Sequence, residues 1–379
     1  MPAGPRNTHA RAGQPSVGAE PGRVRPPDSI PSLTAIRGIA AWWVVLYHFR
    51  EYLPSWLRPA VEPGFLAVDF FFILSGFIIA YNYITLFDRP TVQGWRQFMA
   101  ARIARIYPLH LTVLLLYLAN PIAITLASST AVPGERYDPT YYVLSLLLIQ
   151  NWGFTDGLAW NVPAWSISTE FLAYLAFPLL AWTALRCLTT PARALLALGL
   201  ALAGLAAWMV PQGISLGGDI ARLGAGRCVI EFFIGMCVFL VWFGWRDHAF
   251  TRFGALAIGL LCAIGLFAFD LPDALVMPLG GACLIYGLAN RTDPLARLFS
   301  SRVLERIGLW SYSTYLVHYF VRDWVKFLLI RDGMPLWIPV TAYLVTTALA
   351  SVILFHWVEE PGRRAFRRWL MPGPAPARP

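Results

Sequence analysis

The stretch Leu33-Thr-Ala-Ile-Arg-Gly-Ile-Ala-Ala-Trp-Trp-Val-Val-Leu-Tyr-His-Phe49 is an apolar segment that carries one arginine and one histidine. Arg37 and His48 lie eleven residues apart. That spacing makes about three helical turns and about 16.5 Å of rise, so both side chains point to the same side of a helix. A charged and an ionisable group on one stripe of a membrane span are costly and usually mark a functional site. The alternative is that Arg37 reaches the headgroups at one face while His48 lies at the opposite interface.

The composition of the whole chain is that of an integral membrane protein. Hydrophobic residues make up 57% of the 379 residues and charged residues only 13%, whereas a soluble domain carries about 25% charged residues. We therefore predict an all-α polytopic membrane protein, a bundle of about ten transmembrane helices. The predicted spans are 33–53, 65–86, 106–127, 165–186, 192–211, 227–245, 252–270, 273–290, 310–330 and 336–358.

Both ends of the chain differ from these spans. Residues 1–31 are rich in Pro, Gly and Arg and contain almost no large apolar side chain, which is typical of a disordered tail. Residues 363–379 are basic and rich in proline. We expect one membrane domain over residues 32–362, between two cytoplasmic tails.

The arginines predict the orientation of the spans. With ten spans and a cytoplasmic N-terminus, 21 arginines fall in inner segments and six in outer segments, in agreement with the positive-inside rule. The apolar run from Tyr141 to Trp152 is too short to cross the bilayer, so we expect it to be interfacial or re-entrant on the outer side. If it crossed, every later loop would change sides and the charge asymmetry would disappear.

Cysteines and net charge argue against other classes of protein. The five cysteines lie mostly in or beside apolar spans and form no Cys-x-x-Cys pair, so we interpret them as small apolar residues rather than disulfides or metal ligands. The net charge of +9 could indicate nucleic-acid binding. Because the arginines cluster between spans, we predict no nucleic-acid partner.

Depth within the predicted bundle sorts the polar residues of the spans into two layers. The outer layer contains His48, Asp69, Glu170, Arg227 and Glu231. The inner layer contains Arg37, Arg102, Arg105, His110, His356 and Glu359, and His318 lies between the layers. A histidine with an acid at the same depth is the arrangement that general-base catalysis needs. An arginine cluster at the inner face suits a phosphorylated cytosolic ligand, because guanidinium and phosphate pair bidentately.

Several of these residues also have a purely structural interpretation. Arg227 and Glu231 are spaced i and i+4 and could simply pair on one helix. Asp69 could stabilise the N-terminus of its helix, where a carboxylate is favoured by the helix dipole. His110 and His356 could be interfacial histidines.

The same residues belong to motifs that follow one another along the chain. The motifs are Leu33-Thr-Ala-Ile-Arg-Gly38 with His48, Asp69-Phe-Phe-Phe-Ile-Leu-Ser-Gly-Phe77, Arg102-Ile-Ala-Arg-Ile-Tyr-Pro108, Trp165-Ser-Ile-Ser-Thr-Glu170 with Tyr174 and Phe177-Pro178, Gly308-Leu-Trp-Ser-Tyr-Ser-Thr-Tyr-Leu-Val-His318, and Glu359-Glu-Pro361. In their order and depth the chain resembles the acyltransferase family 3 membrane proteins, which O-acylate sugars, lipopolysaccharide, exopolysaccharide and some secondary metabolites. The resemblance covers residues 32–362.

The resemblance implies an activity and a cellular location. It implies transfer of an acyl group, acetyl in the first instance, from cytosolic acyl-CoA to a hydroxyl of a carbohydrate such as exopolysaccharide, O-antigen or a glycolipid. It implies a catalytic His48 and a donor site formed by Arg37, Arg102 and Arg105, with no metal. The expected location is the bacterial cytoplasmic (inner) membrane, with both termini in the cytoplasm.

Acyl transfer from a thioester needs a base for the acceptor and stabilisation of the oxyanion. We assign His48 as the base, with Asp69 or Glu170 as its carboxylate partner. Arg102 and Arg105 would bind the CoA phosphates, and Arg37 would lie along the pantetheine arm. Direct transfer and an acyl-histidine intermediate both remain open.

Other classes of function also fit the pattern. A transporter or flippase of a lipid-linked or small polar substrate would also have ten spans, buried charges and helices interrupted at positions such as Gly280 and Gly281. A sensor of acyl-CoA or lipid would have the same sites without turnover. The sequence shows no two-fold repeat of the kind that many transporters have.

Overall fold

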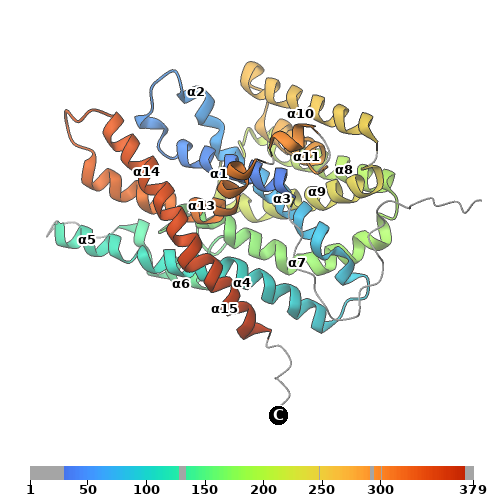
Figure 1. Ribbon diagram of the computed structural model, residues 1–379, viewed down its shortest axis with the longest axis horizontal. Helices are drawn as coiled ribbons and strands as arrows, with labels where there is room; N and C mark the ends of the chain where they lie inside the picture. Colours follow the sequence, from blue (N-terminus) through green and yellow to red (C-terminus); the bar gives the residue numbers. More distant parts are fainter. Residues whose placement is uncertain (1–29, 128–133, 247, 291–293, 300, 372–379) are drawn as a thin grey trace, which may run out of the picture.

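Helices form every regular element of the described chain. The computed structural model describes residues 30–127, 134–246, 248–290, 294–299 and 301–371. Within these ranges the chain folds into α-helices, short 3-10 turns and one π-helical turn, with no strand (Figure 1). The predicted all-α class is therefore confirmed. The predicted tail residues 1–29 and 372–379 lie outside the described residues.

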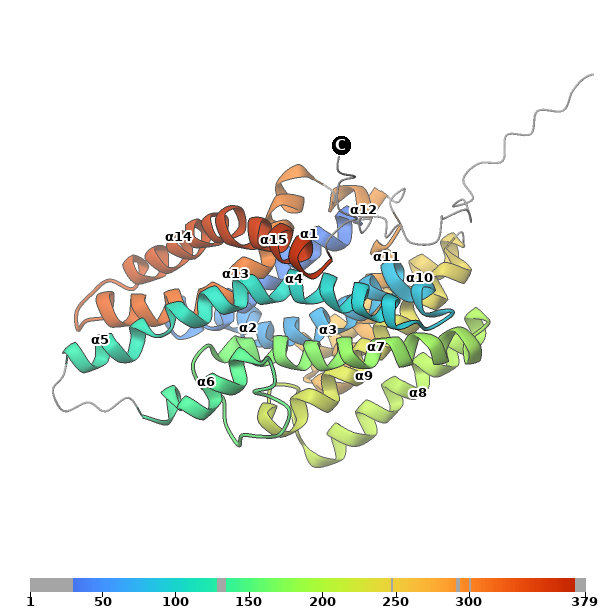
Figure 2. The same ribbon diagram turned by 90° about the horizontal axis from the view of Figure 1, so that it is seen from below.

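Each predicted span overlaps one long helix, and most of these helices run along a common direction (Figure 2). They are α1 Pro31–Tyr47, α3 Ala67–Tyr83, α4 Val92–Leu116, α7 Trp165–Cys187, α8 Pro191–Met209, α9 Ile220–Trp245, α10 Ala249–Phe269, α11 Asp273–Leu288, α13 Arg302–Leu329 and α14 Trp337–Leu354. Shorter helices are α2 Arg58–Val61, α5 Ala119–Ala127, α6 Pro139–Leu146, α12 Pro294–Leu298 and α15 Glu360–Leu370.

Length and composition identify the helices that can cross a membrane. Seven helical segments of the described chain are long and apolar enough, which confirms the polytopic prediction. They are Arg58–Phe87, Val92–Leu126, Val162–Cys187, Pro191–Gln212, Ile220–Trp245, Ala249–Phe269 and Trp337–Leu370. Three further predicted spans fall on α1, which has 17 residues, on α11, which has 16, and on the more polar α13. The ten-span topology stays a prediction.

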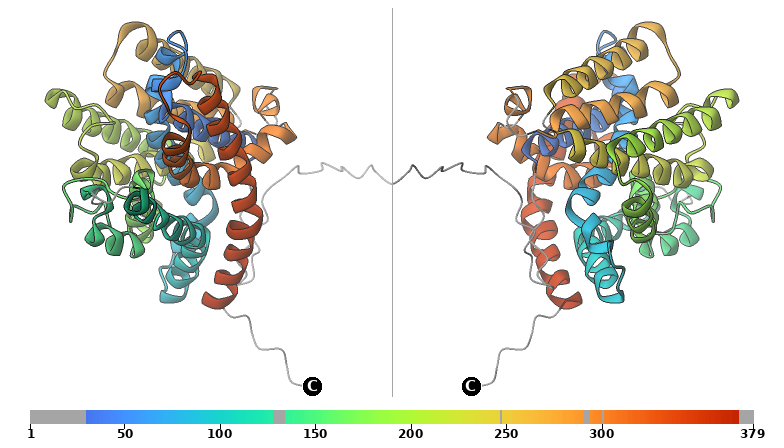
Figure 3. Two further views of the ribbon diagram at one scale, coloured as in Figure 1. Left: turned by 90° about the vertical axis from the view of Figure 1, so that its left-hand side faces the viewer. Right: turned by 90° about the vertical axis from the view of Figure 1, so that its right-hand side faces the viewer.

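The C-terminal part of the described chain is a continuous helical rod. A π-helical turn, Phe355–Glu359, joins α14 to α15. The rod runs along one side of the molecule (Figure 3), where α15 packs against α4. The helix thus continues through residues 363–370, the first part of the segment expected to be a tail. A π-helical turn shifts the side chains that follow it around the helix, and such turns are frequent at functional sites.

Glycines bring two pairs of helices into close contact. A Cβ atom on Gly308 of α13 would lie 1.9 Å from the carbonyl oxygen of Thr34 on α1. A Cβ atom on Gly76 of α3 would lie 1.9 Å from the carbonyl oxygen of Phe232 on α9. Small residues at helix contacts let backbones approach closely in membranes. The first contact places the whole length of α1 against α13, and both helices contribute to the site described below.

The short apolar run from Tyr141 to Trp152 forms the last six residues of the eight-residue helix α6, Pro139–Leu146, and the turn after it. Eight residues rise about 12 Å, less than half of the about 30 Å of a bilayer core. The turn is buried: Asn151 is 1% exposed, its backbone N–H donates to the Ser168 hydroxyl at 3.1 Å, and its side chain donates to the Ile220 carbonyl. The helix cannot cross a membrane by itself. The side on which it lies stays a prediction.

Candidate active site

A cavity of about 150 Å³ lies between α1, α3, α4, α7 and α13, and several charged side chains reach into its mostly apolar wall. Its lining residues are Arg37, Val68, Phe71, Phe72, Leu74, Ser75, Ile78, Ile79, Arg102, Arg105, Ile106, Ser166, Ile167, Glu170, Tyr174, Ser311, Tyr312 and Tyr315. The structure therefore brings together all three arginines predicted to serve the donor. Glu170, one of the two predicted catalytic carboxylates, faces the same cavity.

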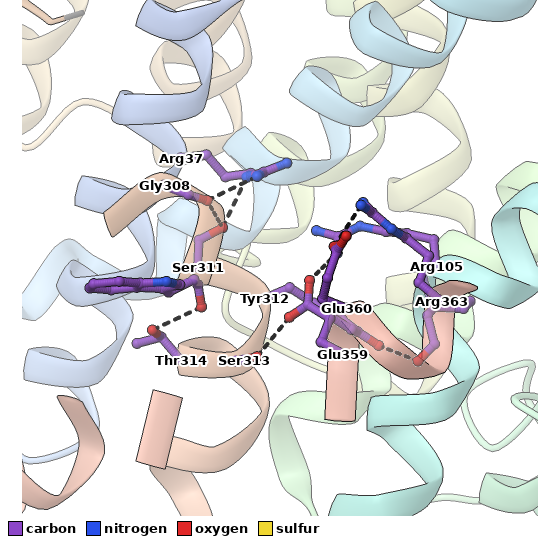
Figure 4. Close-up of polar contacts among 12 residues, drawn as sticks. Arg37, Arg105, Gly308, Ser311, Tyr312, Ser313, Thr314, Glu359, Glu360 and Arg363 are labelled. Atoms are coloured by element: carbon purple, nitrogen blue, oxygen red, sulfur yellow. Dashed lines mark hydrogen bonds and ion pairs between the residues drawn. The ribbon is translucent and has the colours of Figure 1, made fainter. Parts of the chain in front are cut away.

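Arg37 reaches the cavity from α1 and is held by neutral groups of α13. Its Nε donates to the Ser311 hydroxyl at 2.9 Å and its Nη2 donates to the Gly308 carbonyl oxygen at 2.9 Å (Figure 4). The close glycine contact between α1 and α13 makes both bonds possible, because it places this carbonyl beside α1. The guanidinium is thus fixed in position by two neutral acceptors rather than by a carboxylate.

Arg105 of α4 is neutralised by a carboxylate. It forms an ion pair with Glu359, the last residue of the π-helical turn, whose side chain is 1% exposed (Figure 4). The other oxygen of Glu359 accepts a hydrogen bond from the Ser313 hydroxyl at 2.6 Å. The predicted inner layer thus includes a fixed ion pair that joins α4, α13 and the C-terminal rod.

Arg102, one turn earlier on α4, has no such carboxylate partner among the ion pairs of the described chain. Its Nη2 donates to the Tyr83 hydroxyl at 3.1 Å, and its guanidinium lies over the Tyr83 and Tyr174 rings at 5.0 and 5.9 Å. Its buried Nε has no hydrogen-bond acceptor. An unmatched donor of this kind beside a cavity is available to an anionic ligand.

Glu170 lines the cavity together with the predicted inner-layer arginines. One of its oxygens accepts from the Ser75 hydroxyl at 2.5 Å. Trp165, the first residue of α7, is 4% exposed, so the start of this helix is packed against the rest of the protein.

Asp69 does not contact His48. It pairs with Arg227 of α9 at 2.9 Å and interacts electrostatically with Glu231, four residues further along α9; each of the three residues is at most 1% exposed. Arg227 also lies over the Trp165 ring at 5.3 Å. Arg227 therefore has a carboxylate partner from α3 in addition to Glu231 of its own helix. We call these three residues the buried triad.

His48 ends α1 and faces α13. Its ring lies 5.2 Å from the His318 ring and 5.0 Å from the Tyr319 ring, measured between centroids. Its backbone carbonyl accepts a hydrogen bond from Arg322 Nε at 2.8 Å. No hydrogen bond or ion pair between its ring and Asp69 or Glu170 occurs in the described part of the chain. The neighbour that the structure gives to His48 is a second histidine.

The sequence alone assigns His318 no role. The motif that ends in His318 is visible in the sequence, but its position beside His48 depends on the packing of α13 on α1. Tyr315 links this histidine pair to the cavity: it lines the cavity, and its ring centroid is 5.9 Å from that of His318. The Tyr315 hydroxyl donates to the Pro163 carbonyl and bonds to the Ser166 hydroxyl, so its ring is fixed at this boundary.

Among the described residues no cluster of three or more His, Cys, Asp or Glu side chains could hold a metal ion. The five cysteines are all free thiols, three of them in or beside the packed helices α9 and α11.

Comparison with known proteins decides the family. The profile described as "Acyltransferase domain" matches residues 30–356. The chain belongs to this acyltransferase family. Its match covers nearly the same residues as the predicted membrane domain, 32–362, and the arginine cavity and both histidines lie within it.

Named relatives of this acyltransferase come from several bacteria. Acyltransferase MdmB of Streptomyces mycarofaciens is 32% identical over 324 residues, which cover 77% of this chain and 79% of that protein. The putative peptidoglycan O-acetyltransferase YrhL of Bacillus subtilis is 26% identical over 89% of this chain and 56% of its own length. The peptidoglycan O-acetyltransferase OatA of Listeria monocytogenes is 23% identical over 88% of this chain and 56% of its own length. No solved structure matches the chain.

Proposed function

We propose that this acyltransferase moves an acyl group, acetyl in the first instance, from cytosolic acyl-CoA to a carbohydrate hydroxyl presented on the other side of the bacterial cytoplasmic membrane. The observation that carries the proposal is the charge of the cavity. Among the described residues, three arginines line the cavity with one carboxylate, Glu170, and Glu359 pairs with Arg105 beside it. A cavity with an excess of fixed guanidinium groups suits an anionic donor and an oxyanion.

The size of the cavity supports the proposal that different arginines bind different parts of the donor. Whole-ligand pockets usually measure about 300–1,000 Å³, and this one measures about 150 Å³. The cavity is therefore suited to the thioester end, while the phosphates remain at the start of the path beside α4. In this proposal Arg102 binds donor phosphate, Arg105 supports it while it is held by Glu359, and Arg37 lies closer to the thioester.

His48 is proposed to be the general base. The acceptor oxygen attacks the thioester carbonyl, its proton passes to His48, and the carbon–sulfur bond breaks to release CoA as a thiolate that takes up a proton. In the described structure neither predicted carboxylate partner contacts His48. We therefore assign Glu170 to the cavity, through Ser75, and Asp69 to the buried triad.

The relatives support the acceptor class. Two of them are named peptidoglycan O-acetyltransferases, one as putative, so a glycan hydroxyl is the acceptor that we propose here. The family match disfavours the transporter or flippase that the number of spans alone would allow. Lipid bilayer, acyl-CoA and a carbohydrate or glycolipid acceptor are the partners of the proposed reaction.

The test is a donor-dependent assay on the full chain in lipid nanodiscs. Purified protein with radiolabelled acetyl-CoA and a panel of glycan acceptors is expected to release free thiol and to place label on one acceptor through an alkali-labile ester. Arg96→Ala is the matched control for Arg102→Ala, because both residues lie on α4 and Arg96 is exposed and outside the cavity. If the protein neither binds acyl-CoA nor releases thiol from it, the proposed function is wrong.

A further inference from the structure

His318 has one ring nitrogen fixed and the other left without a partner. The residue is fully buried, at 0% exposure. Its Nδ1 lies 2.6 Å from the Tyr315 carbonyl oxygen. A carbonyl oxygen can only accept, so Nδ1 carries a hydrogen and, in the neutral ring, Nε2 carries a lone pair. That Nε2 has no hydrogen-bond partner.

A bare, buried acceptor of this kind is costly, since an unsatisfied polar group loses its hydration without compensation. The bond to Tyr315 would be enough for a histidine with only a structural role. Protonation of Nε2 would not remove the cost, because it would put a second positive charge near Arg322, whose charge acts on His318. We therefore expect a hydrogen-bond donor to approach this nitrogen during the reaction.

The ring of His48 is close enough to supply that donor after a rotation. Its centroid is 5.2 Å from the His318 centroid, and the rings are tilted by 34°. Two imidazoles set edge to edge at such a separation bring facing nitrogens to about 3 Å, which is hydrogen-bond distance. The torsion that turns a histidine ring has a broad energy minimum, so a modest rotation of His48 would make the bond.

We propose that His318 is the positioning residue of the proposed base, in the role that an aspartate has in a Ser-His-Asp triad. His318 Nε2 accepts a hydrogen bond from one N–H of His48. The other nitrogen of His48 then has a lone pair, and it faces the acceptor. The chain of groups runs from the Tyr315 carbonyl through His318 and His48 to the acceptor hydroxyl. This inference rests on the proposed function of His48.

The proton balance of the step follows from this chain. The acceptor hydroxyl gives its proton to the free nitrogen of His48 as its oxygen bonds to the thioester carbon. The resulting imidazolium of His48 donates a stronger, charge-assisted hydrogen bond to His318 Nε2. When the carbon–sulfur bond breaks, His48 returns the proton to the CoA thiolate, and both histidines are neutral again. No oxidant, metal or further reactant is needed.

Three substitutions separate this role from a structural one. The amide nitrogen of His318→Asn can take the place of Nδ1 and keep the bond to the Tyr315 carbonyl, but nothing replaces Nε2. The carbonyl oxygen of His318→Gln can reach the place of Nε2 and accept from His48. His318→Phe keeps the volume of the ring and removes both nitrogens.

The measurement is steady-state transfer in nanodiscs, with kcat and KM determined for each substrate and acyl-CoA binding measured separately. We expect kcat of His318→Asn and His318→Phe to fall about 100-fold, at the lower end of what a general base contributes. His318→Gln should retain more activity than His318→Asn, and acyl-CoA affinity should change less than twofold in all three. Thermal midpoints identify any variant that fails to fold.

The outcomes separate the two proposals. If the parent protein transfers acyl groups and His318→Asn does so equally well, the positioning role of His318 is overturned while the proposed function stands. A parallel loss in His318→Asn and His318→Gln, with weakened acyl-CoA binding and lowered thermal midpoints, would assign His318 to structure and also overturn the inference. If the parent protein transfers nothing, it is the proposed function that fails.

Discussion

Two groups of buried charge in this acyltransferase are built in opposite ways. The arginine cavity has more cations than carboxylates and has open space beside them. The buried triad has two carboxylates around one arginine, each residue at most 1% exposed, at the contact of α3 with α9. A charged group beside open space can serve a ligand, whereas we expect a charged group enclosed by its partners to act on helix packing.

The histidine pair belongs with the arginine cavity. A substitution in this pair is expected to have the largest effect on activity. His48→Ala should lower acyl transfer by about 100-fold or more, because the acceptor loses its base. Folding should be unaffected, since the His48 ring makes ring contacts but no hydrogen bond in the described structure. The measurement is product formation per folded protein. Normal turnover by a well-folded His48→Ala variant would remove the histidine pair from the site.

Removing the central cation of the buried triad should act on stability instead. Arg227→Leu leaves two buried carboxylates without a counter-charge and is expected to cost about 3–5 kcal/mol. The thermal midpoint and the fraction of monodisperse protein in detergent report this loss. Adding Asp69→Asn should recover part of it, because fewer buried negative charges then remain. If Arg227→Leu folded normally but had lost activity, the triad would belong to the catalytic site after all.

Arg102 and Arg105 should differ in the same way as the arginine cavity and the buried triad: Arg102 should act on ligand binding and Arg105 also on stability. Both effects should be smaller than those above. Arg102→Ala should weaken acyl-CoA binding about tenfold, a typical value for a lost hydrogen bond to a charged group, without loss of stability. Added salt should weaken binding to the parent protein more than to this variant. Arg105→Ala should also destabilise, because Glu359 stays buried without a cation. Glu359→Gln should restore stability in the Arg105→Ala background but should not restore affinity.

The last prediction concerns the orientation of the chain in the membrane, and its substitutions are expected to change stability and activity least. Asp138 and Asp156 flank the short apolar run, and cysteines at both positions should react with a membrane-impermeant reagent from outside the cell. Cys187 is exposed at the far end of α7 and should stay unlabelled, which makes it an internal control. The other cysteines are removed first. Labelling at position 138 but not at position 156 would mean that the chain crosses the membrane between them. Every later span, including α7 with Glu170, would then run in the opposite direction, and the ten-span topology would be wrong.

Much of the site follows from helical spacing, and some of it does not. Arg102 and Arg105 are one turn apart on a single helix, so their common direction is local and the sequence predicts it. The partners of Glu170 and Asp69 are not local. Glu170 accepts from Ser75 of α3 and lines the cavity, and Asp69 pairs with Arg227 of α9. Position along a single helix does not show which side chains of other helices meet these carboxylates.

The sequence by itself determined the all-helical membrane class, the family resemblance and the stripe that holds Arg37 and His48, since hydrophobicity and helical period act within a single segment. The tertiary structure decided which segments meet. It placed α13 on α1 through Gly308, held Arg105 with Glu359 and set His318 beside His48. These contacts join residues more than 250 positions apart. They depend on how helix surfaces fit together, and spacing along one chain does not contain that information.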